Sequence, residues 1–449
     1  KGVTEDTILV GNTAGTTGAL ATIGGPFNVG IQAAFAAYNA QGGFNGKSVK
    51  LQHYDDGGVA AQSVTLTEQL IHEDEVFAIV GNFASNCVAA NLPVIKEANV
   101  PMVYAAAGND ELLNEAAEGA DRGIFPVQPL NRTEGRSLIV RAFADAQNAV
   151  GTLTGGLGAT KVAVIANQDE ASQATLNGVK EEAANLPASK KDNIVYQDVP
   201  GTDFGAAATA IVAAGCDTVI LTVTGTHFIS ALTALAQANF KGNVLTSYNN
   251  SSADVLNNGG KLTEAGLDIM SKMTIYAQGW LDVTSTEYVY AKDTPLFRTY
   301  KMQDSKLYGE GVVGFTESYW NVAESIFNYA YTVDKGTAWA MSFNSYALAG
   351  YIAGNMFCES LKALEASGKD LTRANLVEIM ETVELPVAMA GTISYKNGAR
   401  TGVEMFSAAV FVDTADAAFG ENATSDHVAA SAAFTGLQSI EELRQYITE

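Results

Sequence analysis

"VFAIVGNFASNCVAANLPVIKEANVPMVYAAAG" (Val76–Gly108) contains two short apolar runs, with a helical pattern between them. Each run ends in glycine, serine or alanine, and almost no charged residue lies beside those ends. Small residues there let the backbone approach another surface closely, whether that surface is protein or ligand. Two apolar strands joined by a helix indicate a parallel βαβ unit.

The first half of the chain continues this alternation on both sides of the quoted stretch. "ILVG" (Ile8–Gly11) and "VKLQHY" (Val49–Tyr54) are predicted strands that flank a helix over about Pro26–Asn39. A helix after Asn131 leads into a second series, whose strands are predicted at Lys161–Ala166, Asn193–Val199, Asp217–Val223 and Asn243–Tyr248. Continuous apolar strands separated by helices predict an α/β fold with two doubly wound parallel-sheet lobes.

The last third of the chain has a different pattern. It holds long helical segments, followed by "GTISYKNGARTG" and the apolar run "SAAVFV". Asn397-Gly398, between short strand-like runs, predicts the turn of a β-hairpin. No Gly/Ser linker separates the lobes, which indicates that the chain crosses between them more than once.

Length and charge narrow the classes of function. With 449 residues, the chain exceeds the usual size of a single core, and its formal net charge is −23. Nucleic acids and anionic membranes are bound through basic patches, so this charge argues against both as partners. No apolar run reaches the roughly 20 residues that span a bilayer. No signal-peptide pattern is present at Lys1, and this says little about where the native protein resides.

Catalytic and metal-binding signatures are missing from the sequence. G-x-S-x-G, H-E-x-x-H and the P-loop pattern do not occur, and "GGLGAT" (Gly155–Thr160) precedes a strand, which disfavours a phosphate loop. Asp55-Asp56 follows a strand end, where carboxylates cap helices more often than they catalyse. The three cysteines and four histidines show no metal-ligand spacing. We expect Cys216 and Cys358 in the core. We predict no enzyme and no cofactor.

The strand ends favour ligand recognition instead. In open parallel sheets, ligands bind outside the carboxyl ends of strands, where helix N-termini point. Ser85 is the predicted N-cap of the helix after "FAIVGNFA", and its hydroxyl and the N–H groups of Asn86 and Cys87 suit a carboxylate. The alternative is that Ser85 only caps its own helix. Cys87 is expected to be a buried thiol in the helix rather than a reactive one. "YAAAG" (Tyr104–Gly108) ends the neighbouring strand and favours a shared binding edge.

"AAYNAQGGFNGKSVKLQHYDDGG" resembles a segment of the branched-chain amino-acid-type (Leu/Ile/Val-binding) solute-binding proteins of ABC transporters. "LIHEDEVFAIVGNFAS", "KEANVPMVYAAAGNDEL" and "GTISYKNGARTG" are similar to that family in the same order. The resemblance implies the type I periplasmic-binding fold, with two lobes, three crossovers and a ligand held between the lobes by hinge closure. On that pattern the crossovers fall near Val127–Pro129, Tyr276–Ala277 and Phe406–Ala408. Lobe 1 is then 1–127 and 277–407, with an insertion over about 309–343, and lobe 2 is 128–276 and 408–449.

The resemblance also implies roles for single residues. Ser85 matches the family serine that binds the ligand carboxylate, and Ala106 matches the alanine whose backbone helps. Gly108 stands where amino-acid binders carry a hydroxyl residue. Thr224 replaces the tyrosine that covers the α-amino acid group, and Tyr248 replaces the glutamate that pairs with the ammonium group. The family's tyrosine-glycine pair is lost near Ala171-Ser172.

These departures from the family pattern leave open whether the ligand carries an ammonium group. A buried ammonium without a carboxylate partner costs several kcal/mol in desolvation. Asp169 and Glu170 lie close to the same edge as possible substitutes, while Tyr248, Asn249 and Asn250 suit a neutral or aromatic ligand or a carboxylic acid without an amine. His227 either faces this edge or only caps its helix. Trp320 and Trp339 are expected in the core rather than the site.

The predicted ligand-binding set lies at strand ends and helix starts in both lobes. It consists of Thr22, Ile23, Phe83, Ala84, Ser85, Asn86, Ala106, Ala107, Gly108, Asp169, Thr224, Gly225, His227, Tyr248, Asn249 and Phe343.

The leading hypothesis is a solute-binding protein that delivers a small amino acid or a carboxylic or aromatic acid to the membrane subunits of an ABC permease. The alternative is a ligand sensor of the same fold that signals to a partner protein. We expect a monomer outside the cytoplasm, either free in the periplasm or lipid-anchored at the outer face of the membrane.

Overall fold

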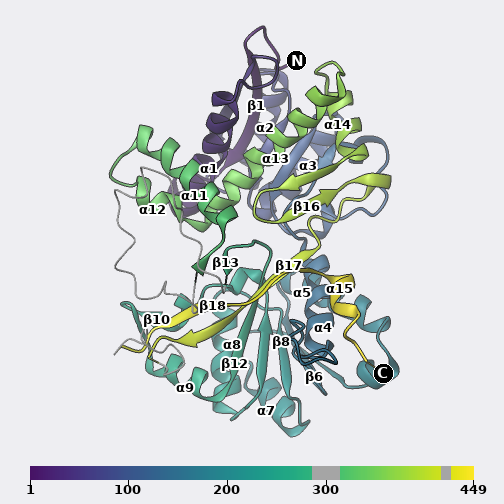
Figure 1. Cartoon of the computed structure of the whole chain (residues 1–449), viewed down its shortest axis with the longest axis vertical. Helices are drawn as coiled ribbons and strands as arrows, with labels where there is room; N and C mark the ends of the chain where they lie inside the picture. Colours follow the sequence, from purple (N-terminus) through teal and green to yellow (C-terminus); the bar gives the residue numbers. More distant parts are fainter. Residues whose placement is uncertain (286–313, 416–425, 449) are drawn as a thin grey trace. The chain divides into compact units, whose positions relative to one another are not determined.

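The computed structural model describes residues 1–285, 314–415 and 426–448. These residues form two compact units, each with its own central sheet (Figure 1). Unit 1 comprises Lys1–Leu130 and Ser318–Val403. Unit 2 comprises the described residues of Asn131–Glu317 and Glu404–Glu449. The chain therefore passes from one unit to the other three times.

The second passage differs from the prediction. Tyr276–Ala277, the predicted crossover, lies inside strand β12 (Thr274–Gly279) of the unit 2 sheet. There Tyr276 pairs with Leu245 on one side and Val410 on the other, so this segment is an interior strand rather than a connection. The chain changes unit at Glu317/Ser318 instead, and the described residues from position 277 up to that point, which were assigned to lobe 1, belong to unit 2.

Unit 1 contains a five-stranded parallel sheet in the order β2-β1-β3-β4-β5. Its strands are β1 (Thr7–Ala14), β2 (Ser48–Asp55), β3 (Ile79–Phe83), β4 (Met102–Ala106) and β5 (Ile124–Phe125). Its helices are α1 (Ala21–Ala40), α2 (Ala60–His72), α3 (Ser85–Glu97), α11 (Glu317–Val333), α12 (Ala338–Ser342), α13 (Ser345–Ser367) and α14 (Arg373–Thr382). Because β2 and β3 lie on opposite sides of β1, the strand order reverses between β1 and β3.

Unit 2 contains a seven-stranded mixed sheet in the order β18-β17-β12-β9-β8-β6-β7. Its other strands are β6 (Val162–Asn167), β7 (Ile194–Val199), β8 (Thr218–Leu221), β9 (Asn243–Thr246), β17 (Met405–Asp413) and β18 (Ala429–Ser439). Its helices are α4 (Asn131–Phe143), α5 (Glu170–Ala184), α6 (Ala188–Lys191), α7 (Gly205–Ala213), α8 (Thr226–Gln237), α9 (Glu264–Lys272) and α15 (Ile440–Arg444). Here the strand order reverses between β6 and β8.

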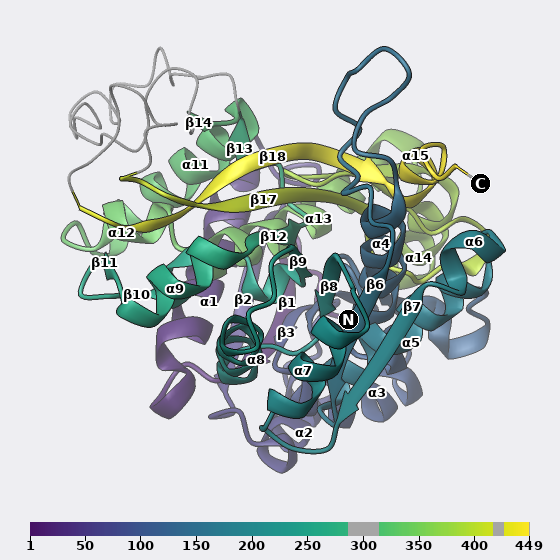
Figure 2. The same ribbon diagram turned by 90° about the horizontal axis from the view of Figure 1, so that it is seen from below.

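Separate apolar cores cover the two faces of the unit 2 sheet (Figure 2). One is built on α7, α8 and α9, with Phe204, Phe228 and Leu232 fully or nearly fully buried. The other is built on α4, α5 and α15, and its fully or nearly fully buried side chains include Phe143 and Leu176. The all-apolar strands lie between these layers, as expected for a sheet covered on both faces. Cys216 and Cys358 are buried, which confirms the prediction.

Two C-terminal predictions are corrected or limited by the structure. The hairpin of unit 1 joins β15 (Glu384–Val387) to β16 (Gly391–Ser394), so its turn precedes Asn397-Gly398. Those two residues form a short 3-10 turn after the hairpin, with Asn397 at φ 59°. Positions 309–313 of the predicted insertion lie outside the described residues. Its remainder includes β14 (Gly314–Phe315), which pairs with β13 (Thr284–Ser285), and helices α11 and α12.

In both units, glycines let the backbones of two neighbouring helices come into direct contact. A Cβ at Gly350 of α13 would lie 1.8 Å from the Phe27 carbonyl oxygen of α1, and one at Gly30 would lie 2.0 Å from the Ala347 oxygen. In unit 2, a Cβ at Gly178 of α5 would lie 1.9 Å from the Arg132 oxygen of α4. Real side chains do not approach a backbone oxygen this closely, so any Cβ must push the helices apart.

Gly178→Ala should therefore destabilise the protein by about 1–3 kcal/mol, the usual effect of overpacking. Chemical unfolding followed by circular dichroism measures the loss. Gly436→Ala is the control in the same unit, because a Cβ there has no neighbour within 4 Å. Equal stability of the two variants would contradict the packing argument.

Candidate ligand-binding site

The start of α3 leaves several hydrogen-bonding groups open. Strand β3 ends at Phe83, and Ala84 is the N-cap residue with φ 76° and ψ 131°. Ser85 is thus the first residue of the helix rather than its predicted N-cap, and its side chain is exposed. Within the described residues, neither its hydroxyl nor the N–H groups of Ser85, Asn86 and Cys87 make a hydrogen bond. The alternative that Ser85 caps its own helix is therefore not supported.

The neighbouring strand end lies beside this helix start. Phe83 of β3 is in register with Ala106 of β4, so Ala106, Ala107 and Gly108 leave the sheet next to Ala84 and Ser85. The Asn109 side-chain amide donates to the Ser85 carbonyl oxygen at 3.4 Å. Cys87 is fully buried, which confirms the prediction of a buried thiol, and burial with nearby Asp56 raises the pKa of this thiol to about 11.

Three other predicted residues of unit 1 lie on elements other than β3, α3 and β4. Thr22 and Ile23 lie in the first turn of α1, and no hydrogen bond joins either one to the start of α3 among the described residues. Phe343 ends α12 and belongs to an aromatic cluster, with its ring centroid 4.8 Å from that of Trp339 and 5.8 Å from that of Trp320. Both tryptophans are half-buried in that cluster.

A buried polar network fixes the loop between β1 and α1. Asn12 donates to Asn28 Oδ1 at 2.8 Å and to the Gly81 oxygen at 3.2 Å, which leaves its own Oδ1 as the acceptor for His53 Nδ1 at 3.0 Å. His53 Nε2 then accepts from the Thr16 hydroxyl at 3.1 Å. Burial, opposed by nearby Asp55 and Asp56, lowers the pKa of His53, in agreement with a neutral ring.

Asp55 holds the same loop from the end of β2. Its carboxylate accepts from the backbone N–H groups of Thr16 and Gly57 at 2.9 and 3.1 Å, and from the Thr17 hydroxyl. Partial desolvation would raise the pKa of Asp55, but these hydrogen bonds outweigh it and lower the pKa to about 2. Asp55 therefore has a structural role, as its position after a strand indicates.

In unit 2, three polar side chains meet where the strand order reverses. Asn167 ends β6, Asp169 precedes α5, and His227 lies in the first turn of α8. Asp169 Oδ2 lies 2.6 Å from Asn167 Nδ2 and 2.9 Å from His227 Nδ1. His227 thus faces the strand-end edge, and Asp169, which no side-chain bond ties to its own helix, faces the same point.

The start of α8 shares with the start of α3 an N-cap residue at positive φ. Gly225 is the N-cap residue at φ 59° and ψ −129°, and exposed Thr226 begins the helix. Asn250 links this turn to the end of β9: its Oδ1 accepts from the Gly225 N–H at 3.3 Å, and its amide donates to the Val223 oxygen and the Thr246 hydroxyl. Thr224, Gly225 and His227 therefore lie next to the turn that carries Tyr248 and Asn249.

Glu134, which was not among the predicted residues, holds the Tyr248 turn. It is fully buried in the first turn of α4, where its Oε1 accepts from the Tyr248 N–H at 2.7 Å and its Oε2 from the Ser247 hydroxyl at 2.8 Å. Burial raises the pKa of Glu134 to about 7, against the lowering effect of those two bonds. A signal existed in the sequence, because Glu134, Leu138 and Arg141 share one helix face by spacing, and the apolar Leu138 indicates burial.

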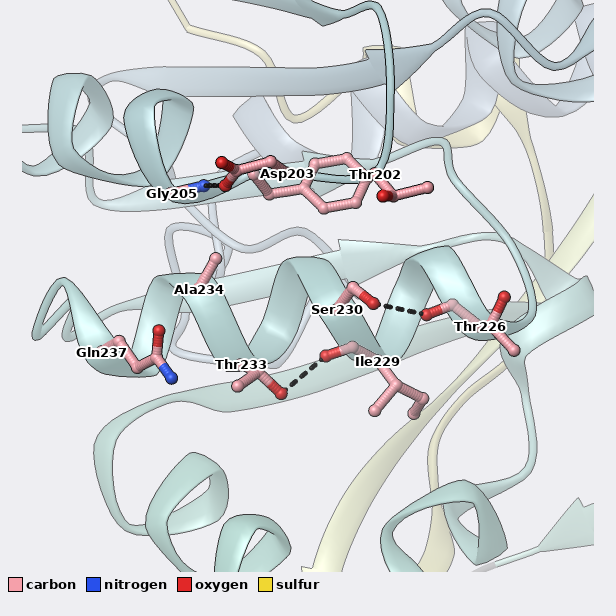
Figure 3. Close-up of a pocket in the computed structure, with 10 residues that line it drawn as sticks. Thr202, Asp203, Gly205, Thr226, Ile229, Ser230, Thr233, Ala234 and Gln237 are labelled. Atoms are coloured by element: carbon pink, nitrogen blue, oxygen red, sulfur yellow. Dashed lines mark hydrogen bonds between the residues drawn. The ribbon is translucent and has the colours of Figure 1, made fainter.

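A pocket of about 490 Å³ lies between the α7 start and one face of α8 (Figure 3). Thr226 is its single residue at the edge described above. The Ser230 and Thr233 hydroxyls donate to carbonyl oxygens of their own helix, and the Asp203 carboxylate accepts from the Gly205 N–H. These groups are occupied within the protein, so the strand-end edges remain the stronger candidate for ligand binding.

Unit 1 has a parallel sheet and unit 2 a mixed one, and each carries open polar groups at the ends of its parallel strands. A model of the periplasmic binding protein family matches residues 7–416, and the chain belongs to that family. Members of the family are solute-binding proteins rather than enzymes.

Individual relatives are distant. A Pseudomonas aeruginosa protein named amino acid binding protein is 26% identical over 214 residues, which cover 47% of this chain and 52% of that protein. The chain thus spans about half the length of that curated relative. A solute-binding protein of an ABC transporter from R. palustris, solved with 4-hydroxybenzoate, has a TM-score of 0.61 at 16% identity over 97% of each chain. A fatty acid ABC transporter substrate-binding protein from Thermomonospora curvata has a TM-score of 0.58 at 18% identity, over 100% of this chain and 96% of that one.

Two further classes of feature are missing from the described parts of the chain. Over residues 1–285, 314–415 and 426–448, no helix combines the length and apolar character needed to cross a membrane. Over the same ranges, no three histidine, cysteine, aspartate or glutamate side chains gather in a way that could hold a metal ion.

Glu134 should make stability depend on pH. Its pKa rises from 4.5 in the unfolded chain to about 7 in the folded one, so the folded protein binds the proton more tightly. The stabilisation that this bound proton gives the folded state is complete below pH 4.5 and is lost as pH rises to about 7. Glu134→Gln carries no charge at any pH. Its free energy of unfolding, relative to that of the native chain, should therefore rise by about 3 kcal/mol between pH 4.5 and about pH 7. Urea unfolding of both proteins from pH 4 to pH 8 measures this, and a difference independent of pH would contradict it.

Proposed function

We propose that this chain is an extracytoplasmic solute-binding protein of an ABC transporter. It binds a small amino acid or another carboxylic acid, aromatic acids included, and delivers it to the membrane subunits of a permease. The observation that carries this proposal is the start of α3, where an exposed Ser85 hydroxyl and three unbonded N–H groups stand at the carboxyl edge of a parallel sheet. Hinge closure and a monomeric state remain predictions.

A carboxylate is the ligand group that suits this helix start. Unbonded N–H groups and the partial positive charge of a helix N-terminus both favour an anion, and no acidic residue lies in the first turn of α3. The similar proteins support the same chemistry, since amino acids, 4-hydroxybenzoate and fatty acids all carry a carboxylate. Their identities with this chain are low, so the proposal rests on the geometry of its own residues.

Ser85→Ala should weaken the binding of carboxylates about 10-fold or more, because a hydrogen bond to a charged group contributes about 1.5–3 kcal/mol. A thermal-shift screen of carboxylic and amino acids supplies the ligand, and isothermal calorimetry measures its affinity. Ser230→Ala is the matched control, because that hydroxyl is bonded within α8. Equal affinities of Ser85→Ala and the native chain would refute the role of Ser85.

A further inference from the structure

Helix α4 and the sheet of unit 2 enclose three side chains that are completely buried but only partly bonded. Ser137, Arg141 and Gln278 are all 0% exposed. Within the described part of the chain, the Ser137 hydroxyl, Arg141 Nε and both amide atoms of Gln278 have no hydrogen-bond partner. Buried polar atoms are nearly always bonded to protein or to a bound molecule, so these four atoms indicate that a bound molecule lies beside them.

The three side chains border the same space. Ser137 and Arg141 lie four residues apart on one face of α4, and a long helical side chain such as Arg141 reaches back over the preceding turn. Gln278 points to the same side of the sheet as Tyr276, whose ring packs on the core that α4 helps to form. Arg141 Nη2 donates to the Phe406 oxygen at 3.0 Å, and Phe406 lies two residues from the β17 residue that pairs with Gln278.

Arg141 brings to this space a positive charge that its bonded partners do not neutralise. Its guanidinium donates at 2.8 to 3.4 Å to four neutral oxygens, those of Gly155, Phe406, Thr435 and Gln438. No carboxylate among the residues that the structure describes forms an ion pair with it. A buried charge is strongly unfavourable unless an opposite charge lies beside it. Water could bond the open atoms, but only an anion also supplies the missing charge.

Glu134 does not take the place of that anion. It lies on the same helix, seven residues before Arg141, and its two carboxyl oxygens accept from the Tyr248 N–H at 2.7 Å and the Ser247 hydroxyl at 2.8 Å. Its carboxyl group is therefore committed to the turn that follows β9.

We infer that unit 2 contains an internal binding site for one small inorganic anion of the halide class. The donors are the Nε–H of Arg141, the hydroxyl of Ser137 and the amide N–H groups of Gln278. Because the open atoms of these side chains are closed off from bulk solvent, the space suits an ion of one or a few atoms. Gln278 Oε1 is left for a water molecule beside the anion.

The site joins two segments through which the chain enters unit 2. Helix α4 begins at the first entry, Asn131, and Phe406, which Arg141 binds, lies two residues after the third passage at Glu404. An anion beside Arg141 therefore stabilises the packing of α4 against β17 within this unit. The inference does not depend on the proposed function.

Equilibrium urea unfolding of the full chain tests the site, at pH 6, below the pKa of Glu134, which is about 7. Ionic strength is held constant while sodium gluconate, whose anion is too large for the site, is replaced by sodium chloride. The ratio of folded to unfolded protein should rise about tenfold for each tenfold rise in chloride above the dissociation constant. Crystals soaked in bromide should show its anomalous signal beside Arg141 Nε and the Ser137 hydroxyl.

Single substitutions locate the effect. Ser137→Ala should weaken chloride binding about 10-fold or more, because it removes a hydrogen bond to a charged group, and Gln278→Met should act in the same direction. Ser172→Ala is the matched control, since Ser172 is also a buried helical serine of unit 2 but its hydroxyl lies 2.7 Å from Thr222 Oγ1. This control should lower stability and leave the chloride dependence unchanged.

Two results overturn the inference. Equal unfolding midpoints in chloride and in gluconate show that water alone fills the space. A chloride dependence that both Ser137→Ala and Gln278→Met leave unchanged shows that the anion binds elsewhere. Neither result bears on ligand binding at Ser85, so the proposed function is tested separately.

Discussion

The N–H groups in the first turn of a helix have no partner inside that helix. A sheet of parallel strands connected by helices gathers several such turns at one edge, because each helix starts where a strand ends. In this protein the constraint acts in both units, at the starts of α3 and α8. The N-cap residues Ala84 and Gly225 have no side chain that caps the helix, so these groups stay uncovered and the fold itself creates positions where a ligand can replace water.

The two helix starts occupy the same place in the order of elements of their units, but the residues around them differ in charge. Each follows the third strand of its series, and each has a positive φ at the N-cap residue, Ala84 or Gly225. An alanine in that conformation costs about 1–3 kcal/mol, a cost tolerated mainly where function requires the geometry. Ser85 stands in a first turn without charged residues, whereas Thr226 adjoins His227 and the Asp169 carboxylate. The two edges therefore suit ligand groups of different charge.

Most of the architecture could be predicted from the sequence, because apolar runs and helical spacing report burial directly. The strand ends near Ser85 and Asp169 followed from the same pattern. Side-chain pairings did not, since the contact of Asp169 with His227 joins residues 58 apart in the chain. The crossover at Tyr276–Ala277 was misplaced because β12 has no feature that distinguishes an interior strand from a connection. Asn397-Gly398 forms a turn, but the hairpin register is set by the earlier β15 and β16.

Two buried charged side chains of helix α4 hold neighbouring loops and strand ends in position. Glu134 and Arg141 lie two turns apart, both are fully buried, and neither forms an ion pair with a described residue. Their desolvation is unfavourable, as the raised pKa of Glu134 and the lowered pKa of Arg141 indicate. Both side chains bond to loops and strand ends: Arg141 donates to the Gly155 and Phe406 oxygens.

An apolar residue at either position would avoid the desolvation but leave those backbone groups unbonded in the interior. Glu134 in particular bonds the N–H of Tyr248, at the candidate edge. The chain enters unit 2 at Asn131, one turn before Glu134. The hydrogen bonds from Glu134 to the turn that carries Tyr248 therefore lie within unit 2, close to where the chain enters it.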